Sequence, residues 1–401
     1  MIDSIQIALS GMVGYQRGLD VISNNVSNMN TSGFRGSSVD FADLFGGSSQ
    51  NELTEDTTHT LMGYGVDSSR TVVDDKAGTP QTTDSGLDLS LQGSGYFIVQ
   101  DPSGAIRYTR DGNFGVVDGN LLMVGQPTKV MGFDANGQLT PISISNLQQS
   151  AGKPTSTVKF SQVLSPNDQT FTVDSVPVVD KLGASHTVKF VFTQDTSTGT
   201  GTNVLTWDVA VFEGNSQVGT GTLQFISQQA PTEPLSMTLS LSNSQSLGVS
   251  LDFQDVSGQI GTTGTSGSSP ASTLAFESQD GTATGTLSSE TFDDKGVMQL
   301  TYSNGQTMAG PTLALAELPD ENGLVQLGNS LFEYDSTKPA TVRKAGDDLK
   351  VQANSLEGSN VDLTTEFSAL ILMQRGYQAA SEVVSTANEM LQQLIDMRSG
   401  K

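Results

Sequence analysis

Few residues of this chain are suited to catalysis near neutral pH. The chain contains two histidines, His59 and His186, and no cysteine, which excludes thiolate nucleophiles, disulfides and cysteine-ligated metals. The two histidines are far apart in sequence and fall in different predicted regions. A catalytic triad or a histidine-based metal site would need partner residues, and the sequence signals none. We interpret each histidine as an ordinary loop or strand residue.

Two other patterns could bind a ligand or transfer a proton. The Gly-Ser-Gly run at Gly93–Gly95 resembles part of a phosphate-binding loop, but it lacks a third glycine, a following helix and a lysine. The carboxylate pairs Asp74–Asp75 and Asp293–Asp294 could hold a cation, yet the neighbouring Gly and Thr residues mark them as turns. We therefore predict that the chain is not an enzyme, and we predict no catalytic residue, no bound cofactor and no metal.

The spacing of apolar residues at the two ends of the chain suits binding rather than catalysis. The residues recur in steps of three and four, a pattern typical of helices that pack lengthwise against other helices. We expect these two sets, the N-terminal stripe and the C-terminal stripe, to carry self-assembly. The N-terminal stripe is Ile5, Ala8, Met12, Tyr15, Leu19, Ile22, Val26 and Met29, and the C-terminal stripe is Leu370, Met373, Tyr377, Ala380, Val384, Ala387, Leu391 and Leu394.

A line of small residues runs beside the N-terminal stripe. Gly11, Gly18 and Asn25 follow one another at heptad spacing, and small side chains in a row let a second helix approach closely. Each glycine costs a helix about 1 kcal/mol relative to Ala. Burial against one partner helix would not offset the conformational entropy lost when the helix becomes ordered. We therefore expect the ends to be ordered only when several copies of the chain supply neighbours.

Between the two ends, short apolar runs alternate with turn residues. Pairs such as Asp118–Gly119 and Asn136–Gly137 separate β-prone runs in the way that hairpin turns do. We predict an α+β fold that is mainly β, with antiparallel β-domains and coiled-coil-forming helices at both termini. The predicted segments are 1–30 (helix), 31–70 (extended connector), 71–146 together with 291–360 (one β-domain), 147–290 (an outer β-domain inserted into it) and 361–401 (helix).

The inserted domain is inferred from a change in charge pattern. No Lys or Arg occurs from Phe190 to Asp294, although this stretch contains eleven Asp or Glu residues. Such a break against the flanking segments indicates a separately folded insertion. Drift in composition on a solvated surface would give the same pattern, and both interpretations stay open.

The overall charge limits the possible partners. The formal net charge is −24, which repels nucleic acid and anionic membranes. No apolar run is long enough to span a bilayer, and the first residues do not form a cleavable signal peptide. We therefore expect neither nucleic-acid binding nor membrane insertion, and we expect any export to leave the N-terminus uncleaved.

Three segments of the chain resemble the rod and hook family of bacterial flagellar axial proteins. The first runs from Ser10 to Phe45 and carries the Asn-Asn and Thr-x-Gly-Phe elements, and the second runs from Asn354 to Leu391 and carries Ser-Asn-Val-Asp-Leu and Gln-Arg-x-Tyr-Gln. Between them, SGLDLSLQGSGYFIV and then YTRDGNFGV at Tyr108–Val116 are similar to the first β-domain of the family. The three segments occur in the order that the family shows, which makes the resemblance specific.

The resemblance implies a structural role and a set of partners. Rod members are typically shorter and lack an inserted domain, so the length favours a subunit of the hook, the flexible tube that acts as a universal joint and transmits torque to the filament. The expected partners are other copies of the chain, the rod, the hook–filament junction, the hook cap and the flagellar type III export apparatus. The expected location is the extracellular hook, next to the basal body. Thr31, Gly33 and Phe34 would anchor the connector.

Two alternatives remain at this point. A distal rod protein would share both terminal segments and would form straight, rigid rods. A secreted β-rich adhesin or enzyme would instead be a protease-resistant monomer that does not assemble.

Overall fold

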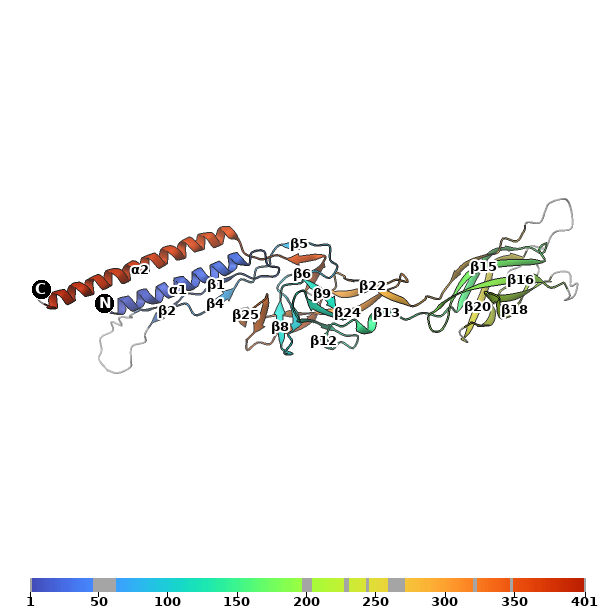
Figure 1. The fold of residues 1–401 in the computed structure, drawn as a ribbon, viewed down its shortest axis with the longest axis horizontal. Coiled ribbons are helices and arrows are strands. Elements are labelled where there is room, and N and C mark those ends of the chain that lie inside the picture. The colour runs from blue at the N-terminus through green and yellow to red at the C-terminus, as the bar shows by residue number, and fades with distance from the viewer. Residues whose placement is uncertain are drawn as a thin grey trace, which may run out of the picture. The chain divides into compact units, whose positions relative to one another are not determined.

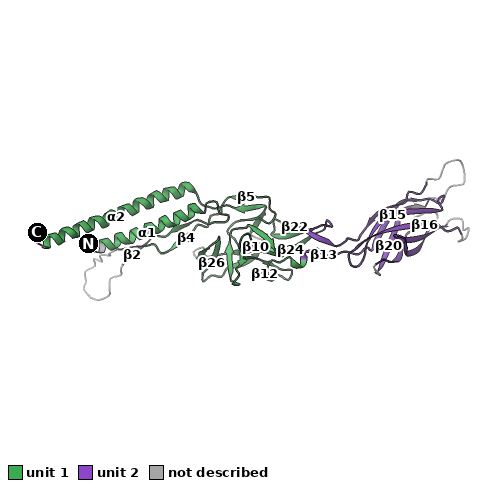
Figure 2. Cartoon of the chain, in the orientation of Figure 1, with its two compact units in different colours: residues 1–146, 290–300, 308–401 green, residues 147–289, 301–307 purple. Residues whose placement is uncertain are grey.

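The computed structural model describes residues 2–45, 63–196, 204–226, 231–242, 245–258, 271–319, 323–346 and 349–399. The chain divides into two compact units (Figure 2). Unit 1 comprises residues 1–146, 290–300 and 308–401, and unit 2 comprises residues 147–289 and 301–307. His59 lies outside the described residues. The fold is mainly β, with several antiparallel sheets and a helix at each end of the chain, which confirms the predicted fold class.

Both predicted terminal helices are present in unit 1. Helix α1 spans Ile2–Ser27 and helix α2 spans Leu363–Ser399, and the two pack side by side (Figure 1). At the start of α2, the backbone N–H of Thr365 donates a 2.9 Å hydrogen bond to Asp362 Oδ1. This bond satisfies an N–H that has no partner inside the helix, and it lowers the pKa of Asp362.

The connector gives α1 further neighbours from the same chain. It contains three short strands, β1 (Ser37–Val39), β2 (Ala42–Phe45) and β3 (Gly63–Asp67), and α1 packs against β1 and β3 as well as α2. The Tyr15 ring of α1 lies 6.0 Å from the Phe41 ring of the connector. The connector therefore supplies α1 with neighbours beyond α2 from the same chain. The expectation that the ends are ordered only when several copies assemble stays a prediction.

The β-part of unit 1 is built from segments on both sides of unit 2 in the sequence. Strand β24 pairs with β7 and β11, and β26 pairs with β8. Two smaller sheets are antiparallel pairs, β28 with β6 and β29 with β5. Strands β28 and β29 come shortly before α2 in the chain. The strands on the N-terminal side are β4 (Thr71–Val73), β5 (Pro80–Thr82), β6 (Leu89–Gln92), β7 (Tyr96–Gln100), β8 (Ile106–Thr109), β9 (Phe114–Val117), β10 (Asn120–Met123), β11 (Lys129–Phe133) and β12 (Leu139–Pro141). Those on the C-terminal side are β22 (Gly285–Phe292) and β23 (Val297–Tyr302), each of which lies partly in unit 2, and β24 (Thr307–Glu317), β25 (Leu324–Gly328), β26 (Leu331–Tyr334), β27 (Thr341–Lys344), β28 (Lys350–Ala353) and β29 (Ser355–Glu357).

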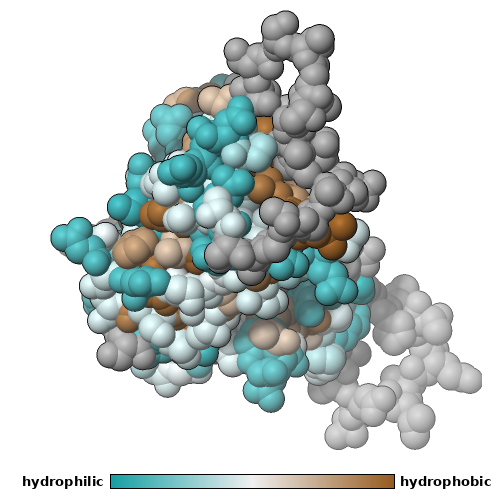
Figure 3. Space-filling model, turned by 90° about the vertical axis from the view of Figure 1, so that its right-hand side faces the viewer, coloured by the Kyte–Doolittle hydropathy of each residue, from teal (hydrophilic) through white to brown (hydrophobic). Residues whose placement is uncertain are grey.

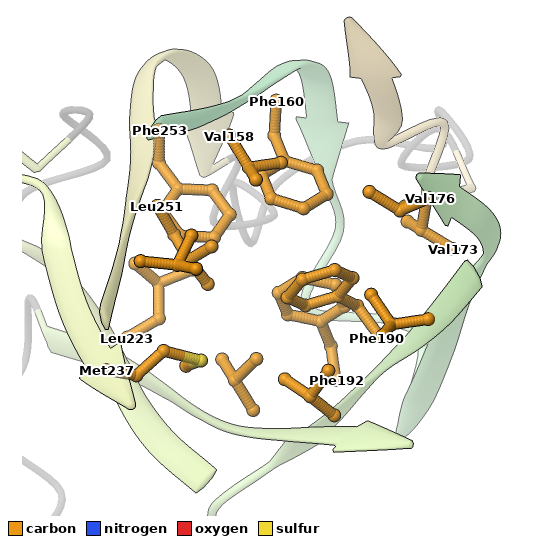
Figure 4. Packing of buried hydrophobic residues seen from close by; sticks show 14 of the residues in the cluster. Val158, Phe160, Val173, Val176, Phe190, Phe192, Leu223, Met237, Leu251 and Phe253 are labelled. Atoms are coloured by element: carbon orange, nitrogen blue, oxygen red, sulfur yellow. The ribbon is translucent and has the colours of Figure 1, made fainter. Parts of the chain in front are cut away.

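Unit 2 contains two four-stranded sheets that share one apolar core. One sheet has the order β15-β16-β17-β18 and the other β19-β20-β14-β21. Phe160 and Phe253 stack 5.0 Å apart in the core, and Phe190 and Phe192 meet Phe160 edge-on (Figure 4). The strands are β14 (Thr157–Leu164), β15 (Thr170–Val179), β16 (Ser185–Gln194), β17 (Val204–Glu213), β18 (Ser216–Ile226), β19 (Leu235–Ser240), β20 (Ser246–Gly258) and β21 (Ala275–Gln279); the short 3-10 helix η1 (Ser145–Leu147) and strand β13 (Gln149–Ser150) precede them.

The surface of unit 2 carries small apolar areas. On the face shown in Figure 3, hydrophobic colour lies in small areas among hydrophilic and neutral ones. Exposed apolar side chains of unit 2 include Leu182, which lies in a turn, and Val204 and Ile226, which are cross-strand neighbours on β17 and β18. Small exposed apolar areas of this kind are normal for a protein surface.

We propose that unit 2 folds on its own core, and the core phenylalanines test this. Phe253→Ala should destabilise unit 2 by about 3–5 kcal/mol, because it leaves a cavity next to Phe160. Trp207 is the single tryptophan and is fully buried in this core, so its fluorescence reports unit 2 during urea unfolding. The helical circular dichroism signal of α1 and α2 should be lost at the same urea concentration as in the unaltered chain. Equal shifts of both signals would contradict independent folding of unit 2.

Candidate assembly interface

Helices α1 and α2 pack in one antiparallel register. A side chain built on Gly18 would approach Met373 Sδ to 3.0 Å, and one built on Gly376 would overlap the Tyr15 ring. Asn25 contacts Glu366 one step further along. A glycine on each helix thus makes room for a large side chain of the other helix, Gly18 for Met373 and Gly376 for Tyr15. Gly11 differs, because a side chain there would meet only Tyr15, at 3.9 Å.

The two stripes form the faces that the helices turn toward each other. Ala8, Ile22 and Ala387 are buried, and most other stripe residues are partly buried. Leu394 differs, because it lies near the far end of α2 and is 45% exposed. Within one subunit, therefore, the stripes carry the contact between the helices along most of their length but not at the end of α2.

Asn25 joins α1 to both the connector and α2. Its side-chain amide donates hydrogen bonds to the Ser37 carbonyl at 2.8 Å and to Glu366 Oε1 at 3.0 Å, and its Oδ1 accepts one from the Ser37 N–H at 3.0 Å. The side chain is buried. Asn25 therefore acts as a polar link among three segments rather than only as a small residue that permits close approach.

The connector leaves α1 through a tight turn at Thr31–Phe34. Gly33 has a φ of 64°, which favours glycine, and a side chain there would overlap the backbone of Arg110 and Asp111. Its N–H donates a 2.7 Å hydrogen bond to the Glu357 carbonyl. Phe34 is buried, whereas Thr31 is exposed and contacts Asn28 through its hydroxyl. Gly33 thus holds this turn against two strand-bearing segments.

A buried group of three charged residues lies at this junction. Glu357 Oε1 pairs with Arg35 Nη2 at 2.9 Å, and Glu357 Oε2 pairs with Arg110 Nη1 at 3.1 Å. All three side chains are at most 2% exposed. Glu357 Oε1 also accepts a 2.8 Å hydrogen bond from the Gly78 N–H. We call Arg35, Arg110 and Glu357 the junction cluster.

Arg110 is held from several sides. Its Nη2 donates to the Gly93 carbonyl at 2.7 Å, and its guanidinium lies 5.0 Å from the centre of the Tyr96 ring. Burial and the nearby Arg35 lower the pKa of Arg110, whereas Glu357 raises it. The Gly-Ser-Gly run therefore serves this packing: a side chain on Gly95 would clash with Leu349, and Gly93 offers its carbonyl to Arg110.

Sequence reasoning missed the junction cluster. Arg35, Arg110 and Glu357 all lie within the segments that carry the family resemblance, next to Phe34, Asp111–Gly112 and Leu356 respectively. The available signal was that each of these three segments contains a charged residue. Without knowledge of which strands pair, however, the sequence does not bring the three residues together.

Asp111, which follows Arg110 in the chain, has a raised pKa. Burial, together with the nearby carboxylate of Asp88, raises the pKa of Asp111 to about 6, against a hydrogen bond from the Asn113 N–H that lowers it. Asp88 is itself buried. Asp111 therefore disfavours the folded state when it is ionised.

Among the described residues, no group of three or more His, Asp or Glu side chains could hold a metal ion. Neither α1 nor α2, as far as they are described, combines the length and apolar character that a membrane span needs.

The three segments that contain Arg35, Arg110 and Glu357 each match a known protein family. Three family models match this chain: "Flagella basal body rod protein" over residues 5–35, "Flagellar hook protein FlgE/F/G D1 domain" over 90–174, and "Flagellar basal body rod FlgEFG protein C-terminal" over 352–397. The flagellar hook protein FlgE of Treponema pallidum is 28% identical over 99% of this chain and 100% of that protein. The flagellar hook protein FlgE of Escherichia coli is 27% identical over 98% of this chain and 99% of that protein.

A rod protein matches over a much smaller part. The flagellar basal-body rod protein FlgG of Caulobacter vibrioides is 39% identical, but over 29% of this chain and 47% of that protein. The full-length similarity is therefore to hook proteins, and the partial similarity is to a rod protein. The chain belongs to the flagellar hook protein family. It is a hook subunit, hence a structural part of the flagellum and not an enzyme. The adhesin or enzyme alternative and the rod alternative are both set aside.

The junction cluster of this hook subunit should be essential for the stability of unit 1. Glu357→Gln removes the one negative charge between two buried arginines, and breaking a buried pair in this way costs about 3–5 kcal/mol. The matched control is Glu317→Gln, because Glu317 pairs with Arg343 at 3.2 Å on the surface, where such pairs contribute about 1 kcal/mol or less. Urea unfolding followed by circular dichroism measures both. Equal small losses would show that the junction cluster contributes little.

Asp111 should make unit 1 more stable at mildly acidic pH. The pKa of Asp111 in the folded state is about 6, which is higher than in the unfolded chain. The loss of folding free energy caused by its ionisation is therefore fully present above pH 6, and it disappears as the pH falls from 6 toward 4. Asp111→Asn should remove it, raising the free energy of unfolding at pH 7.5 by at most about 3 kcal/mol and by much less at pH 4. The variant can still accept the hydrogen bond from Asn113. A stabilisation that is the same at both pH values would contradict this assignment.

Proposed function

We propose that this hook subunit polymerises through surfaces of α1 and α2 that one chain leaves open. The observation that carries the proposal is the end of α2. In the register set by Gly18 with Met373 and Tyr15 with Gly376, the described part of α1 reaches only to the level of Glu389. Beyond it, α2 continues to Ser399 (Figure 1).

The apolar side chains on this last part of α2 are open to solvent. Leu394 is 45% exposed, Ile395 59% and Met397 72%. Large apolar side chains on an unaccompanied helix end lose the stabilisation that burial would give, about 1.5–3 kcal/mol each. Another copy of the chain that covers them would recover it.

A second open line runs along the rest of α2. Val383, Met390 and Met397 are spaced by heptads and are exposed. Val383 and Met390, with Ala387 and Ser4 of α1, line a largely apolar groove of about 400 Å³. A groove of this kind along a helix pair can receive one face of a further helix.

Helix α1 offers a candidate surface to enter such a groove. Ile7, Leu9 and Val13 are exposed on α1. Because the groove and these residues belong to different surfaces of one chain, contact between them would be heterologous. Heterologous contacts repeat from copy to copy and generate tubes or filaments. The N-terminal and C-terminal stripes would then hold each subunit together, and the open lines would join subunits.

The proposed mechanical role depends on the paired helices and on the largely polar surface of unit 2. We propose that the helices of many copies form the inner layer of a tube that acts as a universal joint and transmits torque, with the β-units outside. On the face drawn in Figure 3, the hydrophobic areas of unit 2 lie among hydrophilic and neutral ones. This suits outer units that slide past one another as a curved tube rotates.

The remaining partners follow from family membership. We propose that the hook subunit contacts the rod, the hook–filament junction proteins and the hook cap, all through the same helical layer. We further propose export by the flagellar type III apparatus with an uncleaved N-terminus, and an extracellular location. The net charge of −24 supports a protein that neither binds nucleic acid nor inserts into membranes.

Charging the open end of α2 tests the assembly proposal. Leu394→Glu should raise the monomer concentration needed for polymerisation by at least about tenfold, equivalent to about 1.4 kcal/mol, while the stability of the monomer changes little because Leu394 is exposed. Gln393→Glu is the matched control, with the same added charge at the neighbouring position. Sedimentation and electron microscopy of the polymer give the readout, and the unchanged chain should form curved tubes. Normal tubes from Leu394→Glu, or straight rigid rods from the unchanged chain, would refute the proposal.

A further inference from the structure

His186 of unit 2 lies between two carboxylates. Its Nδ1 is 2.7 Å from Glu213 Oε1, and its Nε2 is 3.3 Å from Asp180 Oδ2. The ring is 10% exposed, and Asp180 is fully buried. We call Asp180, His186 and Glu213 the histidine cluster. Sequence reasoning took His186 for an ordinary strand residue, because Asp180 and Glu213 come from other parts of the sheet.

The histidine cluster connects three elements of unit 2. Asp180 begins the turn between β15 and β16, and its Oδ1 accepts hydrogen bonds from the N–H groups of Leu182 and Ala184, both at 2.8 Å. Glu213 ends β17, and its Oε2 accepts a 2.8 Å hydrogen bond from the Ser242 N–H. Ser242 lies between β19 and β20, in the opposite sheet. The ring of His186 therefore couples the turn to both sheets.

The same turn supports the two chain segments that enter unit 2. These segments, residues 150–157 and 279–285, are called the neck, and Lys153 and Thr282 pair across it through two 2.8 Å backbone hydrogen bonds. The Thr284 N–H donates to the Gly183 carbonyl of the turn at 3.0 Å. Gly152 packs so closely on Gly183 that neither position has room for a side chain.

We propose that the charge on His186 controls how firmly the β15–β16 turn holds the neck of unit 2. Protonated imidazole donates from both nitrogens, so it can bind Glu213 and Asp180 together. Neutral imidazole has one N–H donor. The lone pair of its other nitrogen then faces a carboxylate oxygen, and the two do not form a hydrogen bond. The Asp180 contact, which is the longer of the two, is the one that is lost, and the buried carboxylate of Asp180 is left without that charge partner.

The pH range follows from the groups that face the ring. Burial alone would lower the pKa of His186, but the hydrogen bonds and charges of Glu213 and Asp180 raise it overall. These two carboxylates are in direct contact with the ring nitrogens. The stabilisation is therefore fully present below the ordinary histidine pKa of about 6.5 and is lost as the pH rises through the higher folded value.

Hydrogen–deuterium exchange of the full chain at pH 6 and pH 9 tests this inference. After correction for the intrinsic exchange rate, protection of the N–H groups of Leu182, Ala184 and Thr284 should fall by about tenfold at pH 9, the effect of losing one charged hydrogen bond. Protection in β11 of unit 1 should not change. Unchanged protection of the turn in the unaltered chain would overturn the inference, whatever the variants do.

Two variants separate His186 from other titrating groups. His186→Gln should make protection of the turn independent of pH between 6 and 9, at the lower level that the unaltered chain shows at pH 9. The matched control is His59→Gln, which removes the other histidine of the chain and should leave the tenfold change in place. A pH-dependent turn in His186→Gln, or loss of the dependence in His59→Gln, would show that another group is responsible.

Discussion

The buried pairing of Glu357 with Arg35 and Arg110 is the constraint on which unit 1 depends. Each of these residues comes from a different part of the chain, and each is at most 2% exposed. A carboxylate buried between two guanidinium groups is stable only when all three are in place. The exit of α1, the turn after β8 and the strand that precedes α2 must therefore meet at one point. The segments that carry the family resemblance are the ones that meet there, which gives their specificity a physical reason.

The junction fixes how α1 and α2 pack against each other. Gly33 and Asn25 fix the end of α1 to the connector, and Asn25 also binds Glu366 at the start of α2. With their ends held, α1 and α2 must run together in one antiparallel register, and the two stripes cover each other along most of their length. What remains open is the far end of α2 and the lines beside the stripes. A subunit whose fold is complete, but whose helical layer is not, is suited to polymerise without a large structural change.

Much of this fold could be predicted from the sequence, and the failures have physical causes. The 3.5-residue rhythm predicted both helices because it reflects local backbone geometry, and Asp362 signalled the start of α2 for the same reason. The packing of Phe41 on Tyr15 was not predicted, because it depends on a fold-back of the connector that no local pattern records. Arg35, Arg110, Glu357 and the histidine cluster were missed, because long-range strand pairing creates their contacts. The stripe residues were expected to carry self-assembly, and we propose instead that they hold the two helices of one subunit together while the open lines beside them join subunits.

We propose that the helical layer of this hook subunit is completed by other copies of the chain. The chain has no cysteine, so a single introduced thiol reports its own surroundings. The most direct measurement is the rate at which a maleimide labels Leu394→Cys in the monomer and in the polymer, under the same conditions. We predict rapid labelling in the monomer, where Leu394 is 45% exposed, and strong protection in the polymer. Equally rapid labelling in both states would contradict the claim.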